Sequence, residues 1–244
     1  MSFSWGRVGA IVRKELRDYR RNRFVIVFTM TVLPLLLVIS PMIQIFTIKA
    51  TISSSKLDTR IGLSLLYMLL IPAVLPSALA AYSVVGEREQ GTLEPILTTP
   101  ISSAEFLIGK ALAVLLPTLL IAYLMFGVFL VAAAIFATSA AASAIFKASH
   151  LLVQLLFTPL LAGWSIWVGV AISTRLSDVR AAQQLGVFAS LPPLVIVALI
   201  ATNAISPSLG VTLTFGAALL LVDLAGWRAV AGMFNRERLI AGRR

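Results

Sequence analysis

Five long stretches of the chain contain no charged residue, and their lengths predict the architecture. They enclose 25, 26, 36, 27 and 42 positions, at 24–48, 61–86, 111–146, 148–174 and 181–222. A helix needs about 20 residues to cross a hydrocarbon core of about 30 Å. The first four stretches therefore hold one span each, and the last holds two, separated by the polar, proline-containing turn at 203–208. We expect an all-α integral membrane protein with six transmembrane helices, near 24–46, 62–85, 109–136, 150–174, 184–202 and 208–227.

The third stretch is longer than one span requires. Its tail, from Ala132 to Ser143, is rich in alanine and serine, and 132–146 could form a helix extension, a re-entrant piece or a loop. The first stretch follows more than twenty residues of a charged segment and lacks a small-residue cleavage site, so we do not expect a cleavable signal. The predicted organisation is an amphipathic cytoplasmic segment at 1–23, one six-helix transmembrane domain at 24–227, and a basic cytoplasmic tail at 228–244.

Composition agrees with a membrane protein. Hydrophobic residues make up 59% of the 244 positions and charged residues 12%, and the mean hydropathy is +0.97. A soluble domain has about 45–50% apolar and about 25% charged residues, and a disordered chain needs low hydrophobicity. The chain has no cysteine, which excludes a disulfide framework, thiolate metal sites and cysteine catalysis.

The basic residues orient the predicted helices. The net charge is +10, from 20 Lys and Arg against 10 Asp and Glu. Six spans place both termini on one side, and 16 of the 20 cations fall on that side; the other four are Lys49, Lys56, Arg60 and Lys147. The positive-inside rule then places both termini in the cytoplasm, so we expect a multi-pass protein of the cytoplasmic membrane. Aromatic residues do not alternate with the cations as a nucleic-acid surface requires, so we expect membrane lipid, and no nucleic acid, as a partner.

The N-terminal segment has the pattern of an amphipathic helix. Its apolar residues recur at spacings of three and four and so share one helix face: Trp5, Val8, Val12, Leu16 and Tyr19. A basic helix with Trp and Tyr on its apolar side suits the membrane interface. Two interpretations remain open: a general interfacial anchor, or an element packed beside a cytoplasmic partner.

The loop at 86–106, between the second and third spans, concentrates the acidic residues. It holds four of the ten carboxylates of the chain: Glu87, Glu89, Glu94 and Glu105. Thr92 can cap a short helix after Gly91, and Pro100 should end that helix. Ser102 or Ser103 then caps the next helix, with Glu105 in its first turn, where the helix dipole favours a negative charge. We expect a short cytoplasmic helix with an apolar surface and acidic surroundings, shaped to dock in a groove of another protein.

The same loop carries a spaced set of residues that resembles a family signature. The set is Glu87, Arg88, Glu89, Gly91, Thr92, Leu93, Glu94, Leu97, Thr99 and Pro100, followed by Glu105, Gly109 and Lys110. This pattern resembles the signature of ABC-2 type ABC-transporter permeases, in particular the subgroup of bacterial sodium and drug exporters. The six-span layout, the amphipathic N-terminal helix and the length extend the likeness over the whole chain.

The resemblance implies partners and roles for these residues. The loop would carry the coupling helix, which sits in a cleft of a separate ATP-binding subunit, and 1–23 would be the family's connecting helix. Two six-helix halves would work with two ATPase subunits, the second half being another copy of the chain or a related permease. The implied ATPase-coupling residues are Glu87, Arg88, Glu89, Gly91, Thr92, Leu93, Glu94, Leu97, Thr99, Pro100 and Glu105. One departure from larger members is the outer loop at 47–61, which is too short for a substrate-receiving domain.

We do not expect the chain to be an enzyme or to bind a cofactor. Gly109 and Lys110 invite comparison with a Walker A motif, but Ala104 and Ala111 stand where its first glycine and its Ser or Thr should be. ATP and Mg would therefore be bound by the partner subunit. His150 is the single histidine, so no histidine-based metal cluster is expected; it is either a plain interfacial residue or has a proton-linked role.

Three further features lie within the predicted spans. Asp223 is the one carboxylate within the predicted spans. It could form an ion pair with one of three arginines (Arg175, Arg180 or Arg228), or it could take part in an ion pathway. Ser165, Gly169 and Ser173 form a small-xxx-small repeat, which favours close helix contact within one subunit or across a dimer. A possible translocation route follows the second span, although the same residues could simply shape packing: Tyr67, Pro72, Pro76, Ser77 and Tyr82.

The leading functional hypothesis is the permease subunit of an ATP-driven exporter that works by alternating access. An ion-coupled secondary transporter is an alternative, but such proteins place ionisable groups near the midplane and show paired repeats, which we do not find in this sequence. A non-transporting membrane anchor or assembly subunit is the other alternative.

Overall fold

The computed structural model describes residues 3–23, 25–48, 53–89, 101–176, 178–202, 205 and 208–233, with the backbone alone at 81–84, 86–89 and 233. Within these residues the fold is all-helical and has no strand. The elements are α1 (Trp5–Arg21), a π-helix η1 (Val25–Val32), α2 (Leu33–Phe46), α3 (Ser54–Glu89), α5 (Ser103–Phe136), α6 (Ser139–Ile145), α7 (Ala148–Ser173), α8 (Val179–Ser190), α9 (Pro192–Ala201) and α10 (Leu209–Met233).

Six helical segments are long and apolar enough to cross a membrane, which confirms the predicted number of spans. They are Val25–Phe46, Ser54–Ala80, Ser103–Phe136, Ala148–Ser173, Val179–Ala201 and Leu209–Gly232. The helices extend beyond the predicted spans at several ends; α3, for example, begins eight residues before position 62. Hydropathy marks the part of a helix that suits hydrocarbon, whereas the helix itself continues through charged turns such as the one holding Lys56 and Asp58.

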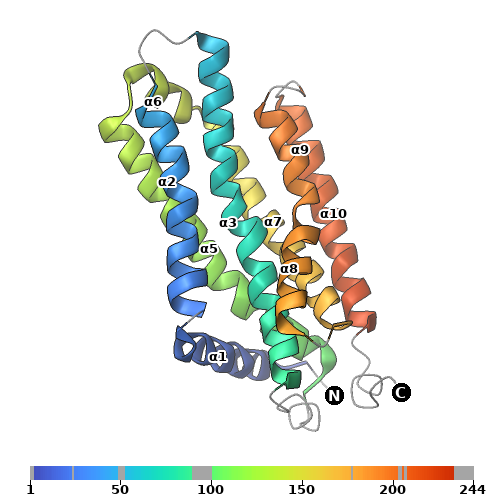
Figure 1. The fold of residues 1–244 in the computed structure, drawn as a ribbon. Helices are drawn as coiled ribbons and strands as arrows, with labels where there is room; N and C mark the ends of the chain where they lie inside the picture. Colours follow the sequence, from blue (N-terminus) through green and yellow to red (C-terminus); the bar gives the residue numbers. More distant parts are fainter. Residues whose placement is uncertain are drawn as a thin grey trace.

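The bundle has two distinct ends. Helix α1 lies across one end, roughly perpendicular to the long helices, and α10 finishes at the same end (Figure 1). We call this the α1 end. The opposite end carries α6, the start of α3 and the start of α7 (Figure 1), and we call it the α6 end.

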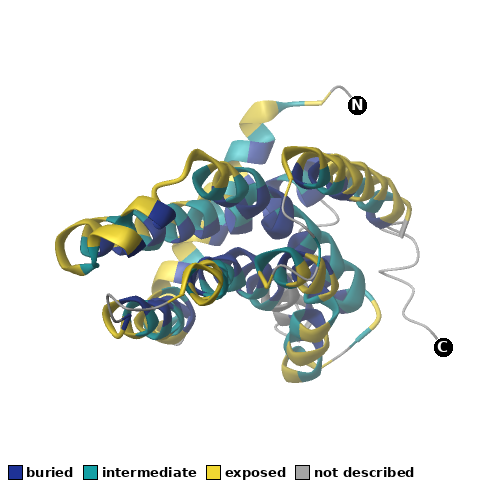
Figure 2. Cartoon of the chain, turned by 90° about the horizontal axis from the view of Figure 1, so that it is seen from above, coloured by how far each residue is buried: buried dark blue, intermediate teal, exposed yellow. Residues whose placement is uncertain are grey.

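Helix α3 occupies the centre of the bundle. In its most apolar window 67% of the residues are buried, against 22–44% for the other five spans, and it packs against α2, α5, α7, α8 and α9. Seen from above, buried residues face the neighbouring helices and exposed ones lie on the outside of the bundle (Figure 2). Helix α3 thus connects most of the other spans of the bundle.

The small-residue repeat of α7 makes its contact with α3, within the chain. The Ser165 hydroxyl donates a 2.6 Å hydrogen bond to the carbonyl oxygen of Ala73. A Cβ atom at Gly169 would lie 2.9 Å from the carbonyl oxygen of Ser77, so the two backbones approach as closely as a glycine allows. Ser173 is buried as well. The sequence left open whether this repeat contacts a helix of the same subunit or of a second one, and in the structure it contacts α3 of the same chain.

Two other sequence expectations are refined. The predicted fifth span is divided at Leu191 into α8 and α9, because Pro192 and Pro193 begin the second helix and cannot donate backbone hydrogen bonds. The tail of the third stretch is neither a simple extension nor an irregular loop. Helix α5 ends at Phe136, and Thr138 then caps the short α6 by accepting a hydrogen bond from the Ala141 amide.

Candidate functional site at the junction of α1 and α5

Glu105 organises the first turn of α5. Ser102 is the N-cap, and its hydroxyl accepts a hydrogen bond from the Glu105 amide, while the Glu105 carboxylate accepts one of 2.8 Å from the Ser102 amide. This reciprocal arrangement is a capping box, which satisfies two backbone donors at the helix start. The sequence left the cap open between Ser102 and Ser103, and the structure places it at Ser102, with Glu105 in the first turn as expected.

The same carboxylate also holds the start of α1. Its Oε1 atom accepts a 2.7 Å hydrogen bond from the Ser4 amide and another of 2.7 Å from Arg7 Nη2. Arg7 Nε lies 3.1 Å from both carboxylate oxygens. These hydrogen bonds raise the pKa of the Arg7 guanidinium further above its usual value, so this cation stays charged at every physiological pH. Glu105 is fully buried, and it joins two segments 98 residues apart in sequence.

A second ion pair joins the two helices further along α1. Lys110 Nζ lies 3.0 Å from Glu15 Oε1, and both side chains are buried, with exposed fractions of 1% and 4%. Lys14 Nζ contacts the same carboxylate oxygen at 3.1 Å, and the Lys110 ammonium lies 5.0 Å from the centre of the Phe106 ring. Both charged groups of this pair are removed from water, so their stability depends on these close contacts.

Between the two ion pairs the helices are in direct contact. A Cβ atom at Gly109 would lie 2.7 Å from Ile11 Cγ2, so the glycine leaves the space that the isoleucine fills. We define the α1–α5 junction as Arg7, Ile11, Glu15, Glu105, Gly109 and Lys110. Two charged contacts with a close apolar contact between them fix α1 to α5 in both position and rotation.

The predicted coupling residues flank this junction in sequence. Glu87, Arg88 and Glu89 are in the last turn of α3, and α5 begins only a few residues after Pro100. The remaining ones lie outside the described residues: Gly91, Thr92, Leu93, Glu94, Leu97, Thr99 and Pro100. Of the whole predicted set, Glu105 is therefore the residue whose side-chain contacts the structure shows.

A comparison with protein families decides what kind of protein carries this junction. The model of the family described as ABC-2 family transporter protein matches residues 9–221, which includes most of α1 and all but the end of the bundle. The chain belongs to the ABC-2 transporter family. A search of curated proteins gives no match.

Family membership and the six apolar helices make the chain a multi-pass membrane protein and an ABC-2 permease. The family supplies the membrane transport component of ABC transporters, and its members typically work with an ABC ATPase. The α1–α5 junction of this permease is thus adjacent in sequence to the loop for which the family resemblance implies the ATPase contact.

Helix α1 packs on the bundle through part of its predicted apolar face. Val8 and Tyr19 are buried as the apolar pattern suggests, but Trp5 is 69% exposed and Leu16 is 38% exposed. The buried face instead includes Glu15. Hydrophobicity alone could not select this face, because the charge of Glu15 is compensated by Lys110, a residue 95 positions away.

Asp223 does not form the predicted ion pair with a described residue. It is 8% exposed in the contact between α10 and α7, and its Oδ1 atom has no hydrogen-bond partner. Arg175, Arg180 and Arg228 are exposed. Arg228 is five residues further along the helix, which turns its side chain about 140° away. The predicted ion pair at Asp223 is therefore wrong for the described residues. A role of Asp223 in an ion pathway stays a prediction.

The residues of the predicted translocation route are packed in the bundle. Pro72, Pro76 and Ser77 are buried on the central helix, and Tyr67 is half-buried. For Tyr82 the structure describes the backbone alone. Ser77 donates its hydroxyl hydrogen to the Val74 carbonyl oxygen. These contacts favour the alternative that the residues shape packing, and a route along them stays a prediction.

Sequence reasoning missed Arg7, Ile11, Glu15 and Lys110 as members of one site. One signal was present: Glu15 and Lys110 are charges placed beside apolar helix positions, which indicates either exposure or pairing. Nothing in the local sequence specifies the partner, because the pairing depends on how α1 crosses the end of α5.

Proposed function

We propose that the chain is the permease subunit of an ATP-driven exporter of the bacterial cytoplasmic membrane. The α1 end and both termini face the cytoplasm, and two copies of an ABC ATPase bind two permease halves there. The second half is another copy of the chain or a related permease. ATP and Mg are bound by the ATPase. The exporter direction is supported by the short connection between α2 and α3, which leaves no room for a substrate-receiving domain.

The observation that carries this proposal is the α1–α5 junction beside the loop at 86–106. An ATPase that moves the loop displaces the end of α3 and the start of α5, because the loop connects them. Glu105 and Lys110 transmit the displacement of α5 to α1 through Arg7 and Glu15. Since α3 is the central helix, the movement reaches the whole bundle and can rock the two halves between inward-open and outward-open states.

The proposal is tested by purifying the tagged chain from native membranes and identifying the proteins that accompany it. We expect an ABC ATPase with a Walker A motif, together with one or two permease species. Glu94→Arg places a cation in the predicted contact and should remove most of the bound ATPase, as quantified by mass spectrometry.

Lys56→Glu is the matched control, because it also reverses a charge but lies at the α6 end in the first turn of α3. It should leave the ATPase bound. Purification of the intact chain without an ABC ATPase, or equal binding in the Glu94→Arg variant, would contradict the proposed function.

A further inference from the structure

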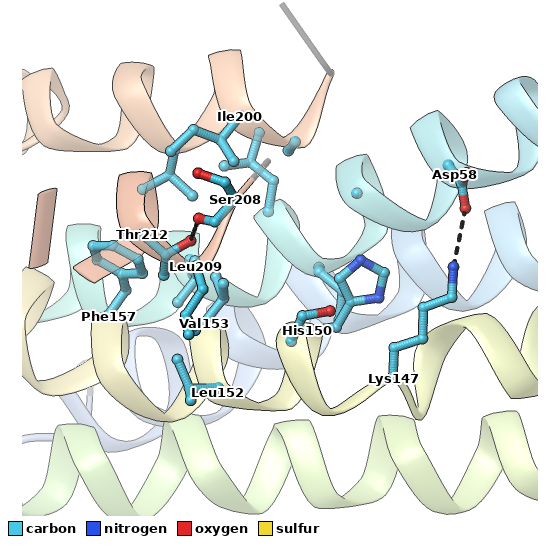
Figure 3. A pocket seen from close by; sticks show the side chains of 17 residues that line it. Asp58, Lys147, His150, Leu152, Val153, Phe157, Ile200, Ser208, Leu209 and Thr212 are labelled. Carbon is cyan, nitrogen blue, oxygen red and sulfur yellow. Dashed lines mark hydrogen bonds and ion pairs between the residues drawn. The ribbon is translucent and has the colours of Figure 1, made fainter. Parts of the chain in front are cut away.

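A pocket of about 290 Å³ opens at the α6 end, between α3, α7, α9 and α10 (Figure 3). Its lining on α3 runs from Asp58 to Leu69, a rise of about 16 Å at 1.5 Å per residue. Half of a hydrocarbon core of about 30 Å is about 15 Å. The pocket therefore extends along the bundle by the depth of one membrane leaflet.

The deep part of the pocket is apolar. Leu69 and Phe157 are each 1% exposed, and Val197 is 5% exposed. Polar side chains are confined to the rim, in the first turns of α3, α7 and α10. An apolar slot with a few polar groups at one end is the usual form of a site for an elongated apolar ligand with a polar head.

Two rim residues have hydrogen-bonding capacity that the described residues do not use. Lys147 Nζ lies 3.7 Å from Asp58 Oδ1, which is beyond hydrogen-bond distance, so its N–H donors are open to another group. His150 Nδ1 lies 2.8 Å from the Ala144 carbonyl oxygen. A carbonyl can only accept, so Nδ1 carries the hydrogen, and Nε2 stays open as an acceptor in the neutral ring or as a donor in the protonated ring. Both side chains point from the start of α7 toward α3 (Figure 3).

Two of the hydroxyl groups at the rim are already engaged. Ser208 accepts a hydrogen bond from the Val211 amide, and Thr212 donates one to the Ser208 carbonyl oxygen. Asp58 is the one acidic lining residue, whereas Lys56 and Arg60 add two exposed cations in the same part of α3. Lys147 and Asp58 therefore balance each other in the lining, and the two cations outside it make the surrounding surface of α3 positive, which attracts anions only weakly through solvent.

We propose that this pocket binds an anionic amphiphile, with one acyl chain in the apolar slot and a carboxylate or phosphate head beside Lys147 and His150. The binding goes beyond the proposed function and does not require ATP or an ATPase. The depth of the slot selects a single chain from one leaflet, and the open donors of Lys147 select an anionic oxygen at the rim.

The test is direct binding to the purified chain in phosphatidylcholine nanodiscs. Radiolabelled palmitate and lysophosphatidylglycerol provide a carboxylate and a phosphate head, and dodecanol provides a neutral one. We expect saturable binding of about one anionic amphiphile per chain. Whichever of palmitate and lysophosphatidylglycerol binds more tightly shows whether the site prefers a carboxylate or a phosphate head. Val153→Phe fills the slot from α7 and should abolish saturable binding, whereas Val128→Phe on the exposed surface of α5 should not.

Lys147→Gln should weaken binding of the preferred anionic amphiphile about tenfold, equivalent to about 1.4 kcal/mol, and leave that of dodecanol unchanged. Lys56→Gln removes the same charge from the same end without lining the pocket, and should have little effect. Equal losses in the two lysine variants would show general surface attraction and overturn the proposal. So would unchanged binding in a folded Val153→Phe variant, with folding checked by its melting temperature.

Discussion

Glu15→Leu should destabilise the protein by about 1.5–3 kcal/mol, because it removes the buried carboxylate that lies 3.0 Å from the Lys110 ammonium. Lys110 is 1% exposed and lies in the α1–α5 junction, where water cannot replace the lost partner. The measurement is equilibrium unfolding of the purified chain in mixed micelles.

The double variant Glu15→Leu/Lys110→Leu tests whether the two residues act as a unit. Replacing both ions by apolar side chains is often neutral or stabilising, so the double variant should recover the stability of the unmodified protein. Lys14→Leu is the control, since Lys14 is 43% exposed and exposed ion pairs contribute about 0–1 kcal/mol. A double variant as unstable as Glu15→Leu would show that the pair is not a unit.

Glu105→Ala should separate the loop from α1 and remove most of the ATP hydrolysis that depends on the permease. The substitution deletes the acceptor of Ser102, Ser4 and Arg7 together, so both the helix cap and the attachment of α1 are lost. The measurement is ATP hydrolysis by the purified complex, compared with that of the ATPase alone.

The control is Asp18→Ala, which removes an α1 carboxylate that is 46% exposed and pairs with Lys14. This variant should keep nearly full permease-dependent hydrolysis. If Glu105→Ala formed a stable complex with unchanged hydrolysis, the junction would have a structural role alone and would not transmit movement from the loop.

Much of the fold could be predicted because a few local rules govern it. The thickness of the hydrocarbon core sets a minimum length for each span, so runs without charge predicted six helices. A serine cap at Ser102 or Ser103 with Glu105 in the first turn could be predicted, since capping involves residues a few positions apart; the reciprocal capping box is seen only in the structure. The division of the fifth span at Leu191 also follows from two consecutive prolines, although the charge pattern alone does not show it.

The candidate site could be predicted only in part, because its contacts join distant segments. Glu105 was identified from its place in the loop, but Arg7 lies 98 residues away and its pairing depends on the angle at which α1 crosses α5. Asp223 shows the opposite error: a cation close in sequence suggested a pair that the rotation of the helix prevents.

The central claim is that an ABC ATPase binds this permease at the α1 end, and cross-linking from single cysteines tests it most directly. The chain has no cysteine of its own, so Glu94→Cys and Lys56→Cys each carry one reactive site, at the loop and at the α6 end. The variants are treated in native membranes with a cysteine-directed photocross-linker, and the products are identified by mass spectrometry. We predict that Glu94→Cys cross-links to an ABC ATPase and that Lys56→Cys does not. Cross-linking of the ATPase from Lys56→Cys, or from neither variant, would contradict the account.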